Sequence, residues 1–309
     1  MASPLSILIP FFALVLVGYF SARRGLIDGH GVKGLNAFVF YFALPALLFD
    51  KTLAAPMDKF IAERAYMLAY LCAALAVFAV AALGARLVFK ADPGRAAVMG
   101  LAGVYGNIGF MGIPVLMVAV GDWVAVPLAL VVLVDVAVLV PLATTIIDMT
   151  RPAEQRRNIK SALGASVFKN PVVLATLAGL GIAALGWHLP APVTTFTDLL
   201  GRSAGPAAMF TLGAVLAGRP LSEGFSEAIY TSAFKLAIYP FVVWWVMTAF
   251  AISPDWRLAA TLGAGMPMAT VLFVLAQQYQ VMPQRISTAV LLSTVLAMAS
   301  ISLLTGWLG

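Results

Sequence analysis

The chain has few of the side chains that build metal centres, disulfides or covalent catalytic sites. It contains one cysteine, Cys72, and two histidines among 309 residues. A single cysteine cannot form an intrachain disulfide or a cysteine metal site, and a buried structural thiol is the expectation for Cys72. No cluster of His, Cys and carboxylates has metal-ligand spacing, no Ser/His/Asp set falls within one apolar run, and no phosphate-binding loop appears. The sequence therefore predicts neither an enzyme nor a bound cofactor or metal.

Charged residues are also scarce. They make up 10% of the chain, hydrophobic residues make up 62%, and the mean hydropathy is +0.99, whereas a soluble domain has about 25% charged residues. Apolar runs of roughly 20 residues, the length that crosses a bilayer as a helix, recur along the chain. The alternating segments of a membrane barrel are missing. The predicted fold class is therefore an all-α integral membrane protein, with the lipid bilayer as its surroundings.

Ten apolar runs are candidate membrane spans. The first, Pro4–Ala22, has no positively charged segment before it and carries its charges after it, so we expect a spanning helix rather than a cleaved signal peptide. The ten runs are residues 4–22, 34–50, 65–88, 96–118, 123–147, 170–187, 203–218, 228–251, 257–279 and 286–308. The polar connection from Asp148 to Lys169 separates the fifth run from the sixth, and at about 20 residues it is a linker rather than a domain.

The formal net charge of +6 reflects an uneven distribution of Lys and Arg between alternate loops. Thirteen of these residues fall on one side of the predicted membrane, five fall on the other, and Lys235 lies within a span. Positive residues accumulate on the cytoplasmic side of membrane proteins. The distribution therefore predicts a multi-pass protein of the cytoplasmic membrane, with the central loop in the cytoplasm and both termini outside. The same distribution accounts for the net positive charge, so no nucleic-acid partner is predicted.

The two halves of the chain resemble each other weakly. Pro10–Gly18 has the same spacing as Pro171–Gly179, and Ala43–Phe49 matches Ala204–Phe210, both at an offset of 161 residues. Five spans per half is an odd number, so the halves would have opposite orientations, as in the inverted repeats of many secondary transporters. The predicted division is a first five-helix repeat over residues 1–148, a cytoplasmic linker over 149–169 and a second five-helix repeat over 170–309.

Two of the runs carry glycines and a proline where a plain spanning helix has no use for them. The stretch from Gly100 to Pro114 contains five glycines and ends on the proline, and Gly263–Thr270 has two glycines before Pro267. Glycine lowers helix stability by about 1 kcal/mol relative to alanine, and proline removes a backbone hydrogen bond. A close-packing face of small residues is one explanation. Breaks at corresponding places in both halves favour the other, which is two interrupted helices that cross at a transport site.

Several segments resemble one known family, and they follow one another in that family's order over nearly the whole chain. Asn107–Pro114 resembles the N-x-x-x-M-G-x-P segment of its fourth helix. The other similar segments are Leu35–Val39 and Phe42–Phe49 in the second helix, Asn170–Pro171 in the sixth, Ala208–Gly213 in the seventh, Phe273–Pro283 in the ninth and Ile286–Val290 in the tenth. The chain is thus similar to the auxin efflux carrier family, which includes bacterial permeases of the malonate-transporter type and, more remotely, the plant PIN-type auxin carriers.

This resemblance implies ten helices in two inverted five-helix repeats, with crossing broken helices four and nine and one set of helices that moves against the other. It also implies an anionic substrate, either a small organic carboxylate or an indole-type carboxylate, and a homodimer. The chain lacks the long cytoplasmic loop of the plant carriers, and Tyr66–Val88 has no acidic residue where those carriers have a carboxylate near the site. These departures favour the short bacterial type.

Asn107 is the candidate contact for a substrate carboxylate. Its side chain offers hydrogen-bond donors beside glycines that leave the backbone open, and exposed helix N-termini suit a carboxylate. The alternative role is an interhelical hydrogen bond, worth about 0.6 kcal/mol in membranes. The predicted substrate-binding set is Asn36, Asn107, Ile108, Gly109, Met111, Pro114, Gly265, Met266, Pro267 and Thr270. Within it, Asn36 could instead shape its helix, and the methionines could be packing fillers.

Asp135 lies near the centre of the fifth span with no basic residue next to it. An isolated carboxylate at the bilayer midplane costs at least about 2.5 kcal/mol, which makes Asp135 the candidate for coupling transport to H⁺ or Na⁺. The alternative is a carboxylate that Lys235 of the eighth span neutralises structurally. Lys235 could instead snorkel to the membrane interface.

The function that these features predict is a secondary-active transporter of a small organic anion, either a malonate-like dicarboxylate or an auxin-like carboxylate, that works by alternating access. The alternative within transport is a sodium-coupled symporter of the bile-acid-symporter-like fold, which would need several carboxylates and amides around the crossing. An intramembrane receptor or enzyme is the rival from another class, and the sequence has no catalytic pair to support an enzyme.

Overall fold

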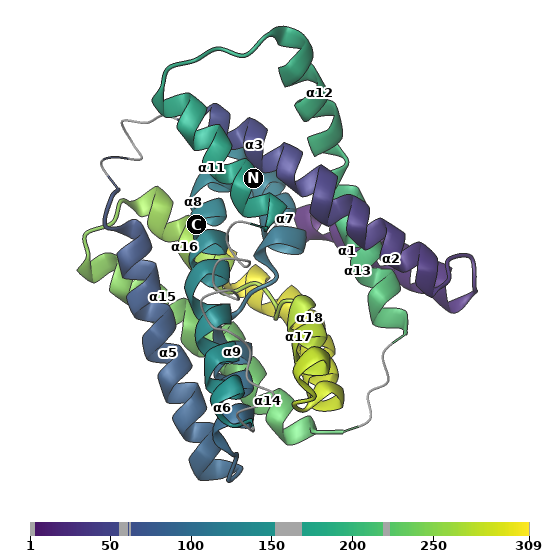
Figure 1. The fold of residues 1–309 in the computed structure, drawn as a ribbon, viewed down its shortest axis with the longest axis vertical. Helices are drawn as coiled ribbons and strands as arrows, with labels where there is room; N and C mark the ends of the chain where they lie inside the picture. The colour runs from purple at the N-terminus through teal and green to yellow at the C-terminus, as the bar shows by residue number, and fades with distance from the viewer. Residues whose placement is uncertain (1–3, 56–60, 62, 152–168, 219–222, 309) are drawn as a thin grey trace. The chain divides into compact units, whose positions relative to one another are not determined.

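The computed structural model describes residues 4–55, 61, 63–151, 169–218 and 223–308. Within these ranges all regular secondary structure is helical (Figure 1), and the one extended pairing is an isolated bridge between Gly106 and Met268. The expected all-α class is therefore confirmed. Most of the predicted linker 149–169 lies outside the described residues.

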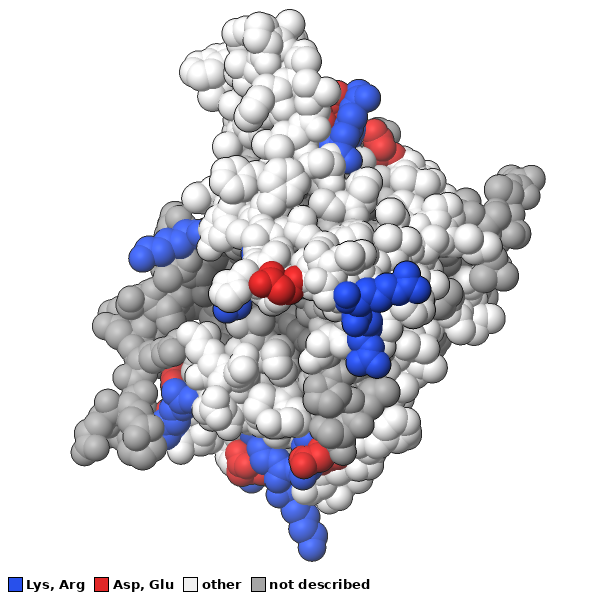
Figure 2. Space-filling view, turned by 90° about the vertical axis from the view of Figure 1, so that its right-hand side faces the viewer, with Lys and Arg blue, Asp and Glu red and all other residues white. Residues whose placement is uncertain are grey.

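Five helices in the described part of the chain are long and apolar enough to cross a membrane. They are Gly29–Leu53, Tyr66–Val88, Asp122–Met149, Ala191–Ala217 and Phe225–Ala249. Shorter apolar helices at Ile9–Arg23, Ile108–Ala119 and Pro171–Ala184 lie within other predicted spans. Figure 2 shows one face of the molecule, on which charged side chains gather at a few places on a largely uncharged surface. The chain is therefore a multi-pass membrane protein, and its count of ten spans stays a prediction.

The helices form two compact units, and each unit draws on both halves of the sequence. The first unit comprises the described residues of 1–64, 108–130 and 168–219, and the second unit those of 65–107, 131–167 and 220–309. The elements of the first unit are α1 (Pro4–Arg23), α2 (Gly29–Phe38), η1 (Val39–Ala43), α3 (Leu44–Leu53), η2 (Ile108–Gly112), α7 (Ile113–Ala119), η3 (Asp122–Val124), the first part of α8 (Ala125–Val134), α11 (Pro171–Ala184), α12 (Ala191–Arg202) and α13 (Ala204–Ala217).

Two pairs of helices in the first unit pack backbone against backbone at glycines. Gly18 of α1 lies against the carbonyl of Phe210 on α13, and Gly179 of α11 lies against the carbonyl of Phe49 on α3, so that neither glycine leaves room for a Cβ atom. Small residues allow this close approach where lipid provides no hydrophobic force between helices. The two contacts are related by one offset, because Gly18 and Gly179 are 161 residues apart, as are Phe49 and Phe210.

The second unit consists of the remaining helices. They are the end of α8, α5 (Tyr66–Val88), α6 (Pro93–Val104), η4 (Asp135–Leu139), α9 (Val140–Met149), α14 (Phe225–Ala233), η6 (Phe234–Ile238), α15 (Tyr239–Ala249), α16 (Pro254–Ala264), α17 (Val271–Tyr279) and α18 (Pro283–Leu308). Helix α6 begins where Asp92 accepts hydrogen bonds from the N–H groups of Gly94 and Arg95 at 2.9 and 3.0 Å. Pro93 takes the first helical position, where no N–H is needed.

In the described part of the chain, four helices contain a five-residue π-turn, and a proline stands two residues after the end of each π-turn. The elements η1, η2, η4 and η6 are followed by helices that have Pro45, Pro114, Pro141 and Pro240 as their second residue. An internal proline clashes with the carbonyl four residues before it. The π-turn opens the helix at that point, because the N–H before the proline bonds five residues back, as Val140 does to the carbonyl of Asp135.

Cys72 corrects one expectation. The residue lies on α5 and is exposed, so the expected buried thiol is wrong. Helix α5 is one of the five candidate spans. A small apolar side chain on the outer face of such a helix can meet hydrocarbon, so burial in protein is not needed to keep it from water.

Candidate functional site

Both stretches that carry glycine and proline interrupt their helices. Helix α6 ends at Val104 and helical structure resumes at Ile108, while α16 ends at Ala264 and α17 begins at Val271. Tyr105, which follows α6, has extended backbone with φ −75° and ψ 104°. The interruptions fall inside the two stretches in which the sequence predicted them.

The two interruptions lie side by side in the second unit and run in opposite directions. The N–H of Asn107 donates to the carbonyl of Pro267 at 2.8 Å, and the N–H of Ala269 donates to the carbonyl of Tyr105 at 3.1 Å. These bonds flank the bridge between Gly106 and Met268. Backbone freed from a helix at membrane depth must be satisfied by protein or by water. Here each interruption satisfies part of the other.

A third helix supports the paired interruptions. The N–H of Met268 donates to Oγ of Ser293 on α18 at 3.2 Å, and Ser293 in turn donates to the carbonyl of Val290 at 3.0 Å. Met266 and Met268 are fully buried beside the pairing. The interruptions therefore have a defined conformation that α18 helps to hold.

Within the predicted binding set, Asn107 has a buried amide whose hydrogen-bond donor lacks a partner among the described residues. The residue is 3% exposed, and its Nδ2 has no hydrogen-bond partner among the described residues. A buried donor without a partner costs roughly 1–3 kcal/mol. An acceptor from a ligand or a bound water would meet this need, as the prediction for Asn107 requires.

The other predicted contacts divide between the two units. Gly265, Met266 and Pro267 belong to the second unit with Asn107, and Thr270 is the residue before the first turn of α17. The remaining five, Asn36, Ile108, Gly109, Met111 and Pro114, belong to the first unit. Ile108, Met111 and Pro114 are buried there, whereas Asn36 and Gly109 are half-buried. The direct hydrogen bond within the predicted set is the one from Asn107 to Pro267.

Asp135 lies in a buried cluster with two tyrosines. It is the first residue of η4 and is 1% exposed. The hydroxyl of Tyr70, on α5, donates to Oδ1 of Asp135 at 3.1 Å, while Oδ2 has no hydrogen-bond partner among the described residues. The rings of Tyr70 and Tyr239 lie edge to face with centroids 6.1 Å apart. Asp135 is thus held by one hydrogen bond in surroundings that exclude solvent.

Lys235 points into the same unit rather than toward the membrane interface. It lies in η6, is fully buried, and its Nζ donates to the carbonyl of Ala264, the last residue of α16. The expectation that it snorkels is therefore wrong. A cation at this end of α16 meets the negative end of the helix dipole. In the described part of the chain no hydrogen bond or ion pair joins Lys235 to Asp135, although both side chains are buried in this unit.

Sequence reasoning missed several partners of these residues. Tyr70 and Tyr239 line the Asp135 cluster, Ser293 bonds the second interruption, and the carbonyl of Ala264 receives Lys235. Among the described residues no group of three or more His, Cys, Asp or Glu side chains could hold a metal ion. A tyrosine in the middle of an apolar span is a weak signal that the sequence does offer for such a cluster.

The first unit has a pocket of its own, and its charges make it a poor anion site. The cavity is about 740 Å³ and includes Pro114 in its lining. Lys51 pairs with Asp122 at 2.7 Å, and Arg202 pairs with Asp198 at 2.7 Å. A third carboxylate, Asp50, also lines it. Carboxylates outnumber cations there, so the buried amide of Asn107 is the better place for an anion.

Comparison with known proteins agrees with the architecture. A model of the family described as "Membrane transport protein" matches residues 5–305. The chain is 32% identical over 305 residues to the "Putative malonate transporter" of Rhizobium meliloti (strain 1021), which covers 98% of this chain and 95% of that protein. It is 27% identical over 276 residues to the "Uncharacterized transporter YfdV" of Escherichia coli (strain K12), covering 89% and 88%.

A plant relative matches over a shorter range. The chain is 32% identical over 137 residues to "Auxin efflux carrier component 8" of Arabidopsis thaliana, which covers 42% of this chain and 37% of that protein. The resemblance seen in the sequence motifs is therefore confirmed. The chain belongs to the membrane transport protein family that includes the auxin efflux carriers.

Proposed function

We propose that this chain is a secondary-active carrier of a small organic anion, either a malonate-like dicarboxylate or an auxin-like carboxylate, and that it works by alternating access. The observation that carries the proposal is the buried amide of Asn107, which has no hydrogen-bond partner among the described residues and lies where two helix interruptions pair. The name of the relative from Rhizobium meliloti, "Putative malonate transporter", supports a dicarboxylate as the substrate.

The chemistry of the interruptions suits a carboxylate. Asn107 offers Nδ2 as a donor, and the nearby start of α17 after Thr270 contributes the positive end of a helix dipole. The negative end of α16 is met by Lys235 through the carbonyl of Ala264, so it does not repel an anion as strongly as an uncapped helix end would. The members of the predicted substrate-binding set that belong to the second unit are the proposed binding site: Asn107, Gly265, Met266, Pro267 and Thr270.

Asp135 and Lys235 are the proposed coupling residues. Both are buried in the second unit, and Lys235 contacts the end of α16 immediately before the interruption. A change in the charge of Asp135 would alter its electrostatic interaction with Lys235. It would thereby alter the hydrogen bond from Lys235 to the carbonyl of Ala264 at the end of α16. Protonation by H⁺ or binding of Na⁺ at Asp135 would in this way be linked to the geometry of the interruption.

The inverted repeat of ten spans belongs to the same proposal. Its support is the offset of 161 residues, which relates the contact of Gly18 with Phe210 to that of Gly179 with Phe49. The same offset relates Pro93 and Pro254, the first residues of α6 and α16. We place the repeats at residues 1–148 and 170–309, the linker 149–169 in the cytoplasm and both termini outside, and we expect a homodimer.

Transport by purified protein in liposomes tests the proposal. We expect uptake of labelled malonate or indole-3-acetate that increases with an imposed proton or sodium gradient. Uptake that needs sodium and accepts bile-acid-like anions instead would favour the bile-acid-symporter-like alternative. A protein that binds either anion without moving it across the bilayer would contradict the carrier and favour a receptor.

A further inference from the structure

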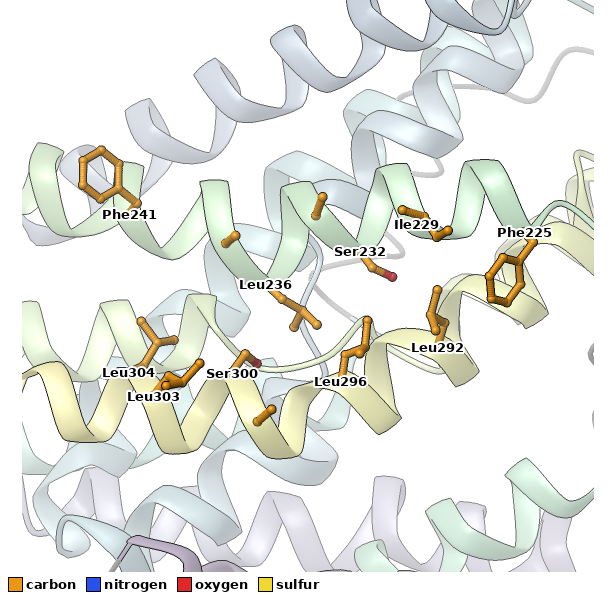
Figure 3. A pocket seen from close by; sticks show the side chains of 13 residues that line it. Phe225, Ile229, Ser232, Leu236, Phe241, Leu292, Leu296, Ser300, Leu303 and Leu304 are labelled. Atoms are coloured by element: carbon orange, nitrogen blue, oxygen red, sulfur yellow. The ribbon is translucent and has the colours of Figure 1, made fainter.

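The second unit carries an apolar groove that the transport proposal does not use. The groove has a volume of about 760 Å³ and runs between α14, η6 and α15 on one side and α18 on the other (Figure 3). Phe225 and Phe241 lie at its two ends on the first wall, and Leu296 and Leu303 line the wall of α18. All four side chains are exposed.

The position of the groove limits what can fill it. One wall is Phe225–Ala249, a helix long and apolar enough to cross a membrane. At membrane depth the surrounding medium is hydrocarbon, so an elongated apolar groove on such a helix matches an acyl chain. The 17 residues from Phe225 to Phe241 are separated by 16 helical rises of 1.5 Å, which extend over about 24 Å. This length is enough to hold one chain.

A buried hydroxyl inside the groove requires an acceptor or donor from a ligand. Ser232 is 2% exposed, and its Oγ has no hydrogen-bond partner among the described residues. Its side chain points into the groove, two turns from Phe225 (Figure 3). An acyl ester oxygen is an acceptor that a glycerolipid would bring to this depth, and pure hydrocarbon would leave the hydroxyl unpaired.

The end of the groove at Phe225 carries two arginine side chains. Gly224, with φ +74°, precedes Phe225, and the stem of Arg285 packs directly against it, so a Cβ at Gly224 would lie 2.5 Å from Cγ of Arg285. Arg285 pairs with Glu227, and Arg95 approaches the same carboxylate at 3.8 Å. Two guanidinium groups share this carboxylate, which cannot use all of their N–H donors.

The remaining guanidinium donors are accessible to a ligand. The side chains of Arg285 and Arg95 are 38% and 32% exposed. Arginine binds phosphate through paired hydrogen bonds, and both arginines belong to the side of the chain that the Lys and Arg distribution places in the cytoplasm. The cytoplasmic leaflet carries anionic lipids, which are attracted by about 1 kcal/mol per basic residue near the surface.

We infer that this groove binds an anionic glycerophospholipid. One acyl chain lies between α15 and α18, an ester oxygen accepts from Ser232, and the phosphate pairs with Arg285 and Arg95. The inference concerns a lipid site and does not depend on which substrate the protein carries.

Native mass spectrometry of the full-length protein in detergent tests the inference, with phosphatidylglycerol and phosphatidylcholine of identical acyl chains as probes. We expect one tightly bound phosphatidylglycerol per chain, with an affinity about fivefold higher than that of phosphatidylcholine. Ala299→Phe, which fills the groove, should abolish tight binding of both lipids. Arg285→Gln should remove the preference for phosphatidylglycerol while binding through the groove persists.

Matched controls come from α5. Leu83→Phe adds a ring at another exposed position of a candidate span, and Arg86→Gln removes an exposed cation from the last turn of α5. Both should bind lipid like the unchanged protein. The site is wrong if Ala299→Phe, shown to be folded by its elution volume and melting temperature, retains the bound lipid. It is equally wrong if this variant loses a dimer instead, since a second copy would then be the occupant.

Discussion

The hydroxyl of Tyr70 donates a hydrogen bond to Oδ1 of Asp135 at 3.1 Å, with both side chains buried. This bond ties α5 to the π-turn η4, which are separated by 65 positions in the sequence. It also fixes the direction of the carboxylate, because Oδ1 is occupied and Oδ2 has no hydrogen-bond partner within the described residues. Any ion that binds Asp135 in this state would approach Oδ2.

Replacement of Tyr70 by phenylalanine should destabilise the protein. The change removes the donor and leaves a buried acceptor unpaired, which costs about 1–3 kcal/mol. We expect a lower melting temperature in detergent for Tyr70→Phe. Tyr41→Phe is the control, because Tyr41 is 58% exposed and surface changes usually stay within about 0.5 kcal/mol. Equal melting temperatures for the two variants would show that the bond to Asp135 contributes nothing.

Lys235 and Asp135 should be energetically coupled despite the missing ion pair. Removal of one charge from a buried pair typically costs about 3–5 kcal/mol, because the other charge stays uncompensated. We expect Lys235→Met to destabilise the protein strongly. The double variant with Asp135→Asn should lose less stability than the sum of the two single losses, by about 0.5–3 kcal/mol. Denaturant or thermal unfolding of all four proteins measures this difference.

The control for that cycle is a partner in the other unit. Thr52 of the first unit is buried and bonds its own helix, at the carbonyl of Leu48. The effects of Thr52→Val and Lys235→Met should add within about 0.5 kcal/mol. If the stability losses of Lys235→Met and Asp135→Asn also add within this limit, the two side chains do not interact. Their proposed joint role in coupling transport to an ion is then unsupported.

Asn107→Ala should weaken substrate binding without unfolding the protein. A hydrogen bond to a charged group contributes about 1.5–3 kcal/mol, so the KM for uptake should rise roughly 10- to 100-fold. Thr294→Val is the matched control, because Thr294 is buried in the same unit and its hydrogen bond among the described residues goes to the carbonyl of Val290 on its own helix. Wild-type uptake by Asn107→Ala at equal membrane expression would exclude the amide from the site.

Two closely packed glycines of the first unit, Gly18 and Gly179, should not tolerate even a methyl group. Gly18→Ala would place a Cβ on the carbonyl of Phe210, and Gly179→Ala would place one against Oγ1 of Thr52 and the carbonyl of Phe49. Such overpacking costs about 1–3 kcal/mol. Gly181→Ala, on the same helix α11, meets nothing within 4 Å and should be neutral or stabilising by up to about 1 kcal/mol. Melting temperatures in detergent distinguish these outcomes. A stable Gly179→Ala protein would mean that α3 and α11 can separate freely.

The sequence predicts the interruptions because their cause is local. Glycine and proline weaken a helix wherever the helix lies, so Gly100–Pro114 and Gly263–Thr270 could be identified without knowledge of packing. The crossing of the two interrupted helices is expected only from the repeat, which places the two breaks at corresponding positions. The hydrogen bond from Asn107 to Pro267 is a finding of the structure. The motifs around Asn107 also led to the family that comparison with known proteins then established.

Partners that depend on packing could not be predicted. Tyr70 and Ser293 come from other helices, and their own sequence neighbourhoods do not identify the residues that they contact. Lys235 was open to two readings because a long side chain near a helix end can either snorkel or turn inward, and the choice depends on whether an acceptor such as the carbonyl of Ala264 lies within reach. The prediction that Cys72 is buried is wrong because it rests on the statistics of soluble proteins, in which cysteine is among the most buried residues.

The π-turns have a consequence for how this sequence can change. A regular helix rotates by about 100° per residue, and a π-turn holds one residue more than the turn it replaces. Everything after η4 is therefore rotated relative to an unbroken helix, and loss of one residue from Asp135–Leu139 would turn the whole of α9 to present a different face. A single-codon deletion there would change the orientation of α9 and leave the composition of α9 unchanged. Among the described residues, Pro45, Pro114, Pro141 and Pro240 mark the π-turns at which such a deletion would have this effect on the helix that follows.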